Sequence, residues 1–130
     1  MPAFARVLGV VVLLAWAPGS LAQSATETAI REVVTRQLDA MKRGDAAVAF
    51  AVASPAIQTM FGDAANFMSM VEKGYPQIYR PRNHRFHELD EAEGKLVRCV
   101  LVESDSGIAV ARYQMIEIDG AWRINGCAVE

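Results

Sequence analysis

The sequence predicts an α+β domain, with three N-terminal helices packed on a curved four-stranded antiparallel sheet. After residue 23, apolar residues first recur at the spacing of helices. Apolar and polar residues then alternate, as in strands, and the turn pair Asp119-Gly120 separates two of these runs. Helices followed by a block of strands are typical of α+β folds that carry their helices on one face of a sheet.

Residues 1–22 have the pattern of a secretory signal peptide. Arg6 supplies a positive charge, an apolar run covers 7–17, and Ser20-Leu21-Ala22 provides small residues before a cleavage point. The apolar run is shorter than the roughly 20 residues that a spanning helix needs. We therefore expect a signal peptide followed by one α+β domain, residues 23–130, that is periplasmic or secreted. No stable membrane insertion is expected after cleavage. If residues 1–22 were not cleaved, they would tether the domain to the membrane.

The charge balance and the histidines exclude several classes of partner. The chain has 13 Lys and Arg against 15 Asp and Glu, and the leader contains one basic residue and no acidic one. A domain with this acidic excess is not expected to bind nucleic acid or an anionic membrane surface.

His84 and His87 point to opposite faces of a strand, and no third ligand has matching spacing. No metal or other cofactor is expected.

The first helix is predicted from its cap and its apolar stripe. Ser24 with Glu27 has the form of a capping box, and Gly44 is a stop signal. The inward stripe consists of Ile30, Val33, Val34, Leu38 and Met41.

Further caps divide the next thirty residues. Asp45 caps a second helix, and Ser54-Pro55 begins a short helical turn that Gly62 ends. Asp63 caps a third helix that closes at Gly74. Helices are therefore expected to occupy the first half of the domain.

Four strands follow, and their turns set a register. The strands are expected at 83–89, 96–103 and 108–118 and from residue 121 onward. Two-residue turns at Asp105-Ser106 and Asp119-Gly120 would place Cys99 opposite Arg112, and Arg112 opposite Cys127. A slip of one residue would exchange the two faces of a strand.

Alternation along these strands defines two faces. The core face carries Leu96, Val100, Val102, Ala109, Ala111, Tyr113, Met115, Trp122, Ile124 and Ala128. The second face mixes apolar residues with Cys99, Arg112, Gln114, Arg123, Asn125 and Cys127. This mixed composition indicates a pocket lining or the surface of a homodimer.

The same residues carry a family resemblance. The motifs are Ser54-Pro55, Ile57-Gln58, Gly74-Tyr75-Pro76, Ile78-Tyr79-Arg80-Pro81 and the ending Gly120-Ala121-Trp122-Arg123-Ile124-Asn125-Gly126-Cys127. Together they resemble a bacterial family known only as a domain of unknown function. The ending also resembles, more distantly, the ketosteroid isomerase-like or SnoaL-like superfamily, which implies a bent sheet around a cone-shaped pocket. The catalytic aspartate and tyrosine of the isomerases have no matching positions here.

The candidate ligand-binding residues lie on the second face. Arg112 and Arg123, flanked by Gln114 and Asn125, could hold a carboxylate or phosphate, and Tyr79 could line the mouth of a pocket together with Tyr75. The alternative is that the two arginines pair with acidic residues of the same chain or with a second subunit.

The state of the two cysteines stays open. Export favours a disulfide between Cys99 and Cys127. The predicted register separates the two residues by the central strand, about 9 to 10 Å, whereas a disulfide needs Cα atoms roughly 4.4 to 6.8 Å apart. The alternatives are buried free thiols or a reactive cysteine.

The predicted function is non-catalytic binding of a small apolar or amphipathic molecule in the concavity of the sheet. The alternatives are a ketosteroid isomerase-like enzyme and a protein-interaction or dimerisation module. The sequence favours binding over catalysis, because no acidic residue stands out on the predicted concave face.

Overall fold

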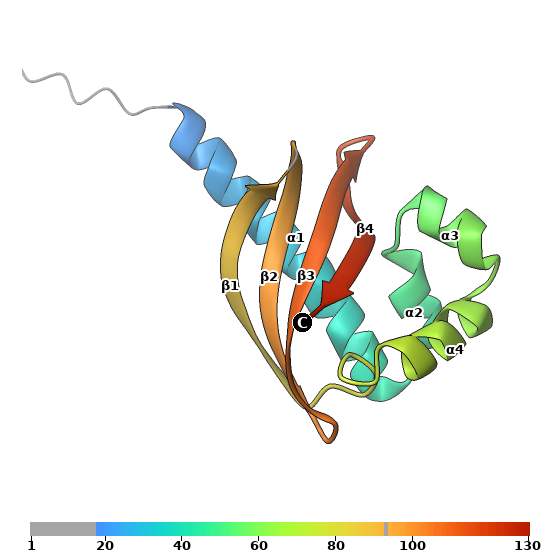
Figure 1. Cartoon of the computed structure of the whole chain (residues 1–130). Coiled ribbons are helices and arrows are strands. Elements are labelled where there is room, and N and C mark those ends of the chain that lie inside the picture. Colours follow the sequence, from blue (N-terminus) through green and yellow to red (C-terminus); the bar gives the residue numbers. More distant parts are fainter. Residues whose placement is uncertain (1–17, 93) are drawn as a thin grey trace, which may run out of the picture.

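A computed structural model describes residues 18–92 and 94–130, and it confirms the α+β class. One layer is a four-stranded antiparallel sheet, and helices pack against it (Figure 1). The elements are α1 (Pro18–Arg43), α2 (Ala46–Ala51), α3 (Pro55–Phe61), α4 (Ala64–Gly74), β1 (Asn83–Ala92), β2 (Lys95–Ser104), β3 (Gly107–Ile118) and β4 (Ala121–Val129). Most of the predicted signal peptide, residues 1–17, lies outside the described residues. None of the helices in the described part has the length and apolar character to cross a bilayer.

Helix α1 crosses one face of the sheet, while α2, α3 and α4 gather beside β4 (Figure 1). The helix starts at Pro18, so the prediction of a cap at Ser24 is wrong: Ser24 lies within a helix already under way. Proline suits a helix start because its φ is preset and its missing N–H would have no partner there. The inward stripe is as predicted, with Ile30, Val34 and Leu38 buried.

The caps of the next three helices form as predicted. The side chains of Asp45, Ser54 and Asp63 accept hydrogen bonds from backbone N–H groups three residues ahead, at 3.2, 3.3 and 2.8 Å. The segment after Ser54, expected as a short helical turn, is a seven-residue helix of its own. The described chain therefore has four helices where the sequence predicted three.

The strand order of the sheet is β1-β2-β3-β4, and the two predicted turns, at Asp105-Ser106 and Asp119-Gly120, join β2 to β3 and β3 to β4. Ser104 pairs with Gly107, and Ile118 pairs with Ala121. Asp119 and Gly120 both have positive φ, 51° and 79°, as a type I′ turn requires.

A bulge in β4 overturns the predicted register between β3 and β4. Gln114 pairs with Gly126, but Met115 pairs with Ile124, so Asn125 is an extra residue in β4. Cys127 consequently lies opposite Tyr113 and not opposite Arg112.

The bulge exchanges the two faces of β4 beyond Asn125. Cys127 shares the helix-covered inner face with Tyr113, while Ala128 shares the outer face with its partner Arg112, the reverse of the prediction. The physical reason is a contact with the α2–α3 connection: the Ser54 hydroxyl donates to Asn125 Oδ1 at 2.7 Å.

The inner face also contains a buried charge. Arg98 is only 2% exposed, and its guanidinium lies 5.0 Å from the centre of the Phe86 ring. Arg31 of α1 lies 5.4 Å from the same ring. Burial lowers the pKa of Arg98, and the neighbouring charge of Arg31 lowers it further. The aromatic ring partly compensates for the water that the buried guanidinium has lost.

The end of α1 is fitted against the Tyr79-Arg80-Pro81 segment. Gly44 follows the helix with a φ of +69°, and a Cβ atom there would lie 2.8 Å from Nη2 of Arg80. Arg80 itself has a positive φ of 59°. The chain therefore needs glycine at residue 44, mainly for its backbone conformation.

We expect Gly44→Ala to lower the free energy of unfolding by about 1 to 2 kcal/mol, because a Cβ atom disfavours the left-handed conformation. Chemical denaturation measures this change. Gly74→Ala is the matched control, since Gly74 ends α4 with open space around it; its effect should be neutral or stabilising by up to about 1 kcal/mol. Equal losses in both variants would contradict the assignment.

Candidate functional site

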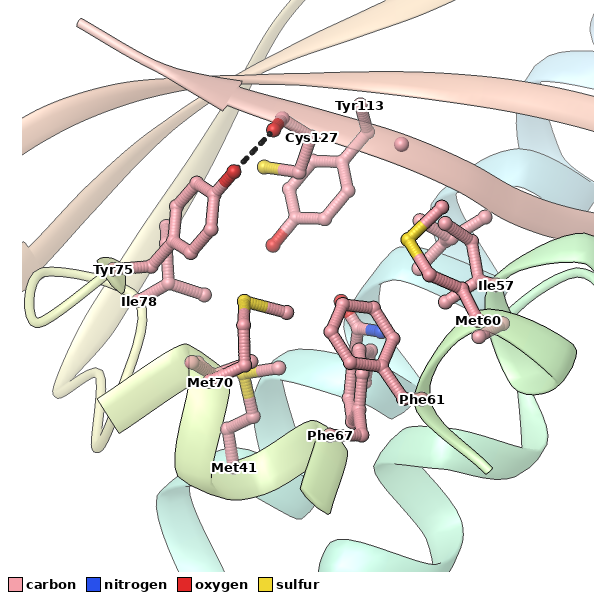
Figure 2. Close-up of a pocket in the computed structure, with 15 residues that line it drawn as sticks. Met41, Ile57, Met60, Phe61, Phe67, Met70, Tyr75, Ile78, Tyr113 and Cys127 are labelled. Carbon is pink, nitrogen blue, oxygen red and sulfur yellow. Dashed lines mark hydrogen bonds between the residues drawn. The ribbon is translucent and has the colours of Figure 1, made fainter. Parts of the chain in front are cut away.

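A cavity of about 240 Å³ lies between the inner face of the sheet and the helices (Figure 2). Its lining consists of Gln37, Met41, Ala53, Ile57, Met60, Phe61, Phe67, Met70, Val71, Tyr75, Ile78, Tyr113, Ile124, Gly126 and Cys127. None of these fifteen residues carries an ionisable acid or base of the Asp, Glu, His, Lys or Arg type. The site is therefore apolar, with a few polar groups set into it.

The positions of apolar residues along α4 explain why this helix forms one wall of the cavity. Phe67, Met70 and Val71 are three and four positions apart, so they lie on one face of the helix and all line the cavity. The Phe67 ring packs against the rings of Phe50 and Phe61, with centroids 5.5 and 5.8 Å away. These contacts hold the wall in a defined shape.

Helix α3 forms the outer rim of the cavity. Ile57, Met60 and Phe61 line it, yet α3 has no fully buried residue. Met60 is 71% exposed, so the cavity reaches the surface beside this side chain. A ligand could enter here.

Tyr113 supplies a free hydroxyl group inside the cavity. The residue is 1% exposed, and its hydroxyl has no hydrogen-bond partner among the described residues. Figure 2 shows the hydroxyl pointing into the cavity. Burial raises the pKa of Tyr113 well above 10, and the adjacent Cys127 raises it further. The hydroxyl is therefore neutral at physiological pH and available to donate a hydrogen bond.

Cys127 and Tyr75 complete this end of the cavity. The Tyr75 hydroxyl donates to the Cys127 backbone oxygen at 3.2 Å, which ties the segment after α4 to β4. Burial raises the pKa of the Cys127 thiol to about 12. The thiol is therefore protonated at neutral pH and a poor nucleophile.

The residues that the sequence singled out for ligand binding lie elsewhere. Arg112 and Gln114 are on the outer face of the sheet, and the Arg123 guanidinium donates to the Ala51 backbone oxygen. Asn125 is held by Ser54. The structure does not bring these four side chains together in the cavity.

Of the two tyrosines expected at a pocket mouth, Tyr75 lines the cavity and Tyr79 does not. The Tyr79 ring is half-buried against the core, with the Arg80 guanidinium 5.6 Å from its centre.

The two cysteines are free and face opposite sides of the sheet. Cys99 pairs with Arg112 on the outer face, whereas Cys127 pairs with Tyr113 on the inner face. Among the described residues, no three His, Cys, Asp or Glu side chains cluster as metal ligands would.

Sequence reasoning does not identify Tyr113 as a candidate site residue, and it names Cys127 only as a possible disulfide partner or free thiol. Alternation puts Tyr113 on the correct face, as a core residue, and puts Cys127 on the wrong face because it does not predict the bulge. One signal is present in the sequence: the hydroxyl of a tyrosine deep in a core needs a partner, and Trp122 is the one other residue of the predicted core face with a polar side-chain group.

The chain belongs to the family described as Domain of unknown function (DUF4864), whose model matches residues 23–130. This match confirms the resemblance to an uncharacterised domain family. Neither a curated protein nor a solved structure matches the chain. The more distant resemblance to the ketosteroid isomerase-like superfamily stays a prediction.

Tyr113→Phe and Tyr75→Phe should change stability in opposite directions. Removing the unpartnered Tyr113 hydroxyl should raise the free energy of unfolding by about 1 kcal/mol, because a buried polar group without a partner is costly. Removing the Tyr75 hydroxyl should lower it by about 1 kcal/mol, because the hydrogen bond to Cys127 is lost. Denaturant titration of the ligand-free proteins checks both signs, and a loss in both variants would count against a free Tyr113 hydroxyl.

The Cys127 thiol should react slowly in the folded protein. At pH 8, a thiol with a pKa of about 12 is alkylated roughly a thousandfold more slowly than one of pKa about 9, since only the thiolate reacts. Iodoacetamide labelling of a Cys99→Ala variant, followed by mass spectrometry, should give a rate rising about tenfold per pH unit to pH 10. A rate that levels off near pH 9 would show an ordinary thiol.

The same raised pKa predicts a loss of stability in alkali. The folded state favours the protonated thiol, so its contribution is fully present below the unfolded pKa of about 9 and is lost as the pH rises toward 12. The variant Cys127→Ala, which lacks the thiol, should therefore lose less stability than the wild type between pH 9 and pH 12.

Proposed function

We propose that the protein is a non-catalytic binding protein that holds a small, largely apolar molecule in the cavity on the inner face of the sheet. The observation that carries the proposal is an apolar cavity of about 240 Å³ that contains one unpartnered hydroxyl group, that of Tyr113. Binding sites for small molecules are typically apolar concavities with a few well-placed polar groups.

The volume suggests the size of the ligand. An apolar cavity of about 150 Å³ is large enough to bind benzene. Scaled from that case, a cavity of about 240 Å³ holds an apolar molecule of roughly ten non-hydrogen atoms. A larger ligand would have to extend past Met60 into solvent.

The composition of the lining favours binding over catalysis. General acid–base chemistry most often uses histidine or a carboxylate, and the described residues supply neither to the lining. Its ionisable groups are the hydroxyls of Tyr75 and Tyr113 and the thiol of Cys127. The raised pKa values of Tyr113 and Cys127 keep both groups protonated, which does not favour nucleophilic attack.

An exported location is part of the proposal. The leader pattern of residues 1–22 supports it, and the family match begins at residue 23, next to the predicted cleavage point. The ligand would then be a molecule of the periplasm or of the surroundings of the cell.

The homodimer alternative keeps its support from the apolar residues on the outer face, where Ile108 is 67% exposed.

Native mass spectrometry of the protein from its exported compartment tests the proposal. We expect a bound mass that denaturing conditions release, and the same spectrum counts the subunits. Ile57→Trp should abolish this bound mass, because an indole ring would occupy the cavity from α3. Thr59→Trp is the matched control: it adds the same ring at an exposed position of α3 outside the lining.

Binding of isopropylbenzene to the purified protein gives a second readout, in case the natural ligand is lost. Its affinity should fall at least about tenfold in Ile57→Trp and stay unchanged in Thr59→Trp, since filling an apolar site removes the burial that drives binding. No bound mass together with no binding of this probe would refute the proposal.

A further inference from the structure

The polar groups of the cavity differ in whether they already have partners. The Tyr75 hydroxyl donates to the Cys127 backbone oxygen at 3.2 Å, and the Gln37 side-chain amide donates to the Ala49 backbone oxygen at 3.2 Å. The Tyr113 hydroxyl has no partner within the described part of the chain. Its hydrogen atom is therefore a buried donor that the cavity still offers to a ligand.

The electrostatic character of the lining restricts the charge of a ligand. Within residues 18–92 and 94–130, no lysine, arginine or histidine lines the cavity, so a carboxylate or phosphate would enter without a counter-charge. Removing an ionised group from water without a partner is very costly. The charged Arg98 lies opposite Tyr113 on the same face, but its guanidinium is at the Phe86 ring and not in the lining.

We propose that the cavity selects an uncharged molecule with an apolar body and one oxygen acceptor, such as a ketone, aldehyde or ester carbonyl, to which the Tyr113 hydroxyl donates. This inference rests on the proposed function and names the chemical class of its ligand.

A carbonyl group fits the single free donor better than an alcohol does. A carbonyl oxygen accepts the hydrogen of Tyr113 and brings no hydrogen of its own, so one contact pairs the buried donor. An alcohol would add a second donor, which would also have to reach an acceptor such as the Gln37 side-chain oxygen. The sulfur atoms of Met41 and Met70, with the rings of Phe61 and Phe67, also suit an aromatic body.

Three probes of nearly the same shape separate these properties. Acetophenone has a ring and a carbonyl group, isopropylbenzene replaces the carbonyl by hydrocarbon, and benzoate replaces it by a carboxylate. Their affinities are measured by ligand-detected NMR titration at neutral pH against the wild type, Tyr113→Phe and Ile57→Trp. Comparing the effect of Tyr113→Phe on two probes cancels their different hydrophobicities.

We expect Tyr113→Phe to weaken acetophenone binding about tenfold and to leave isopropylbenzene binding unchanged or slightly tighter, because only acetophenone loses a hydrogen bond. Benzoate should bind at least about a hundredfold more weakly than acetophenone. Ile57→Trp should weaken both neutral probes, which localises them in the cavity.

The outcomes that overturn the inference differ from those that overturn the proposed function. If isopropylbenzene binds and Ile57→Trp displaces it, but Tyr113→Phe affects both neutral probes equally, the cavity binds ligands and the carbonyl preference is wrong. Tighter binding of benzoate than of acetophenone would also overturn the preference. If none of the probes binds and the protein carries no bound mass, the proposed function itself fails.

Discussion

The contact between Ser54 and Asn125 is the constraint on which the site depends. The Ser54 hydroxyl donates to Asn125 Oδ1 at 2.7 Å and also caps α3 by accepting from the Ile57 N–H. The Ser54 N–H donates to the Ile124 backbone oxygen at 2.7 Å. One serine therefore fixes both the start of α3 and the place where β4 bulges. Because of that bulge, Cys127 faces inward beside Tyr113, and the helix that carries the rim of the cavity is anchored to the strand that forms its floor.

The inner face of the sheet combines an apolar core with a short polar row. Arg98 and Tyr113 face each other across β2 and β3, and each has a buried polar atom without a partner in the described structure. Buried polar groups are nearly always paired, so an exception calls for an explanation. For Arg98, the explanation is the Phe86 ring, which offers an electrostatic partner without a hydrogen bond. Tyr113 has no such compensation among the described residues, and this difference is why the cavity, and not the buried arginine, is the proposed ligand site.

The sequence predicted those parts of the fold that depend on neighbouring residues. The caps at Asp45, Ser54 and Asp63 and the turn at Asp119-Gly120 are local, so their residues suffice to identify them. The bulge depends on a contact between residues 71 positions apart, which no local pattern encodes. The cavity depends on the space that α3 and α4 leave above the sheet, and side-chain volumes in a sequence do not give that space. The predicted ligand residues Arg112, Gln114 and Arg123 lie on the outer face, as alternation predicts, but the cavity lies on the inner face beneath the helices. The inserted residue changes the face only of the residues that follow it in β4, such as Cys127.

The bulge also influences how the protein ages chemically. Asn125 precedes Gly126, and in an Asn-Gly sequence the glycine nitrogen readily attacks the carbonyl carbon of the asparagine side chain and expels ammonia. Water then opens the resulting succinimide to aspartate or isoaspartate. In the folded chain the Asn125 amide is held by Ser54, and Gly126 is fixed in the ladder opposite Gln114. Ring closure needs backbone rotations that this arrangement prevents, so deamidation has to proceed through states in which β4 has opened. The chemical lifetime of the domain therefore depends on the stability of its last strand. Each deamidated molecule would carry a new negative charge at the residue that holds α3 to the sheet, and in isoaspartate also an extra backbone carbon.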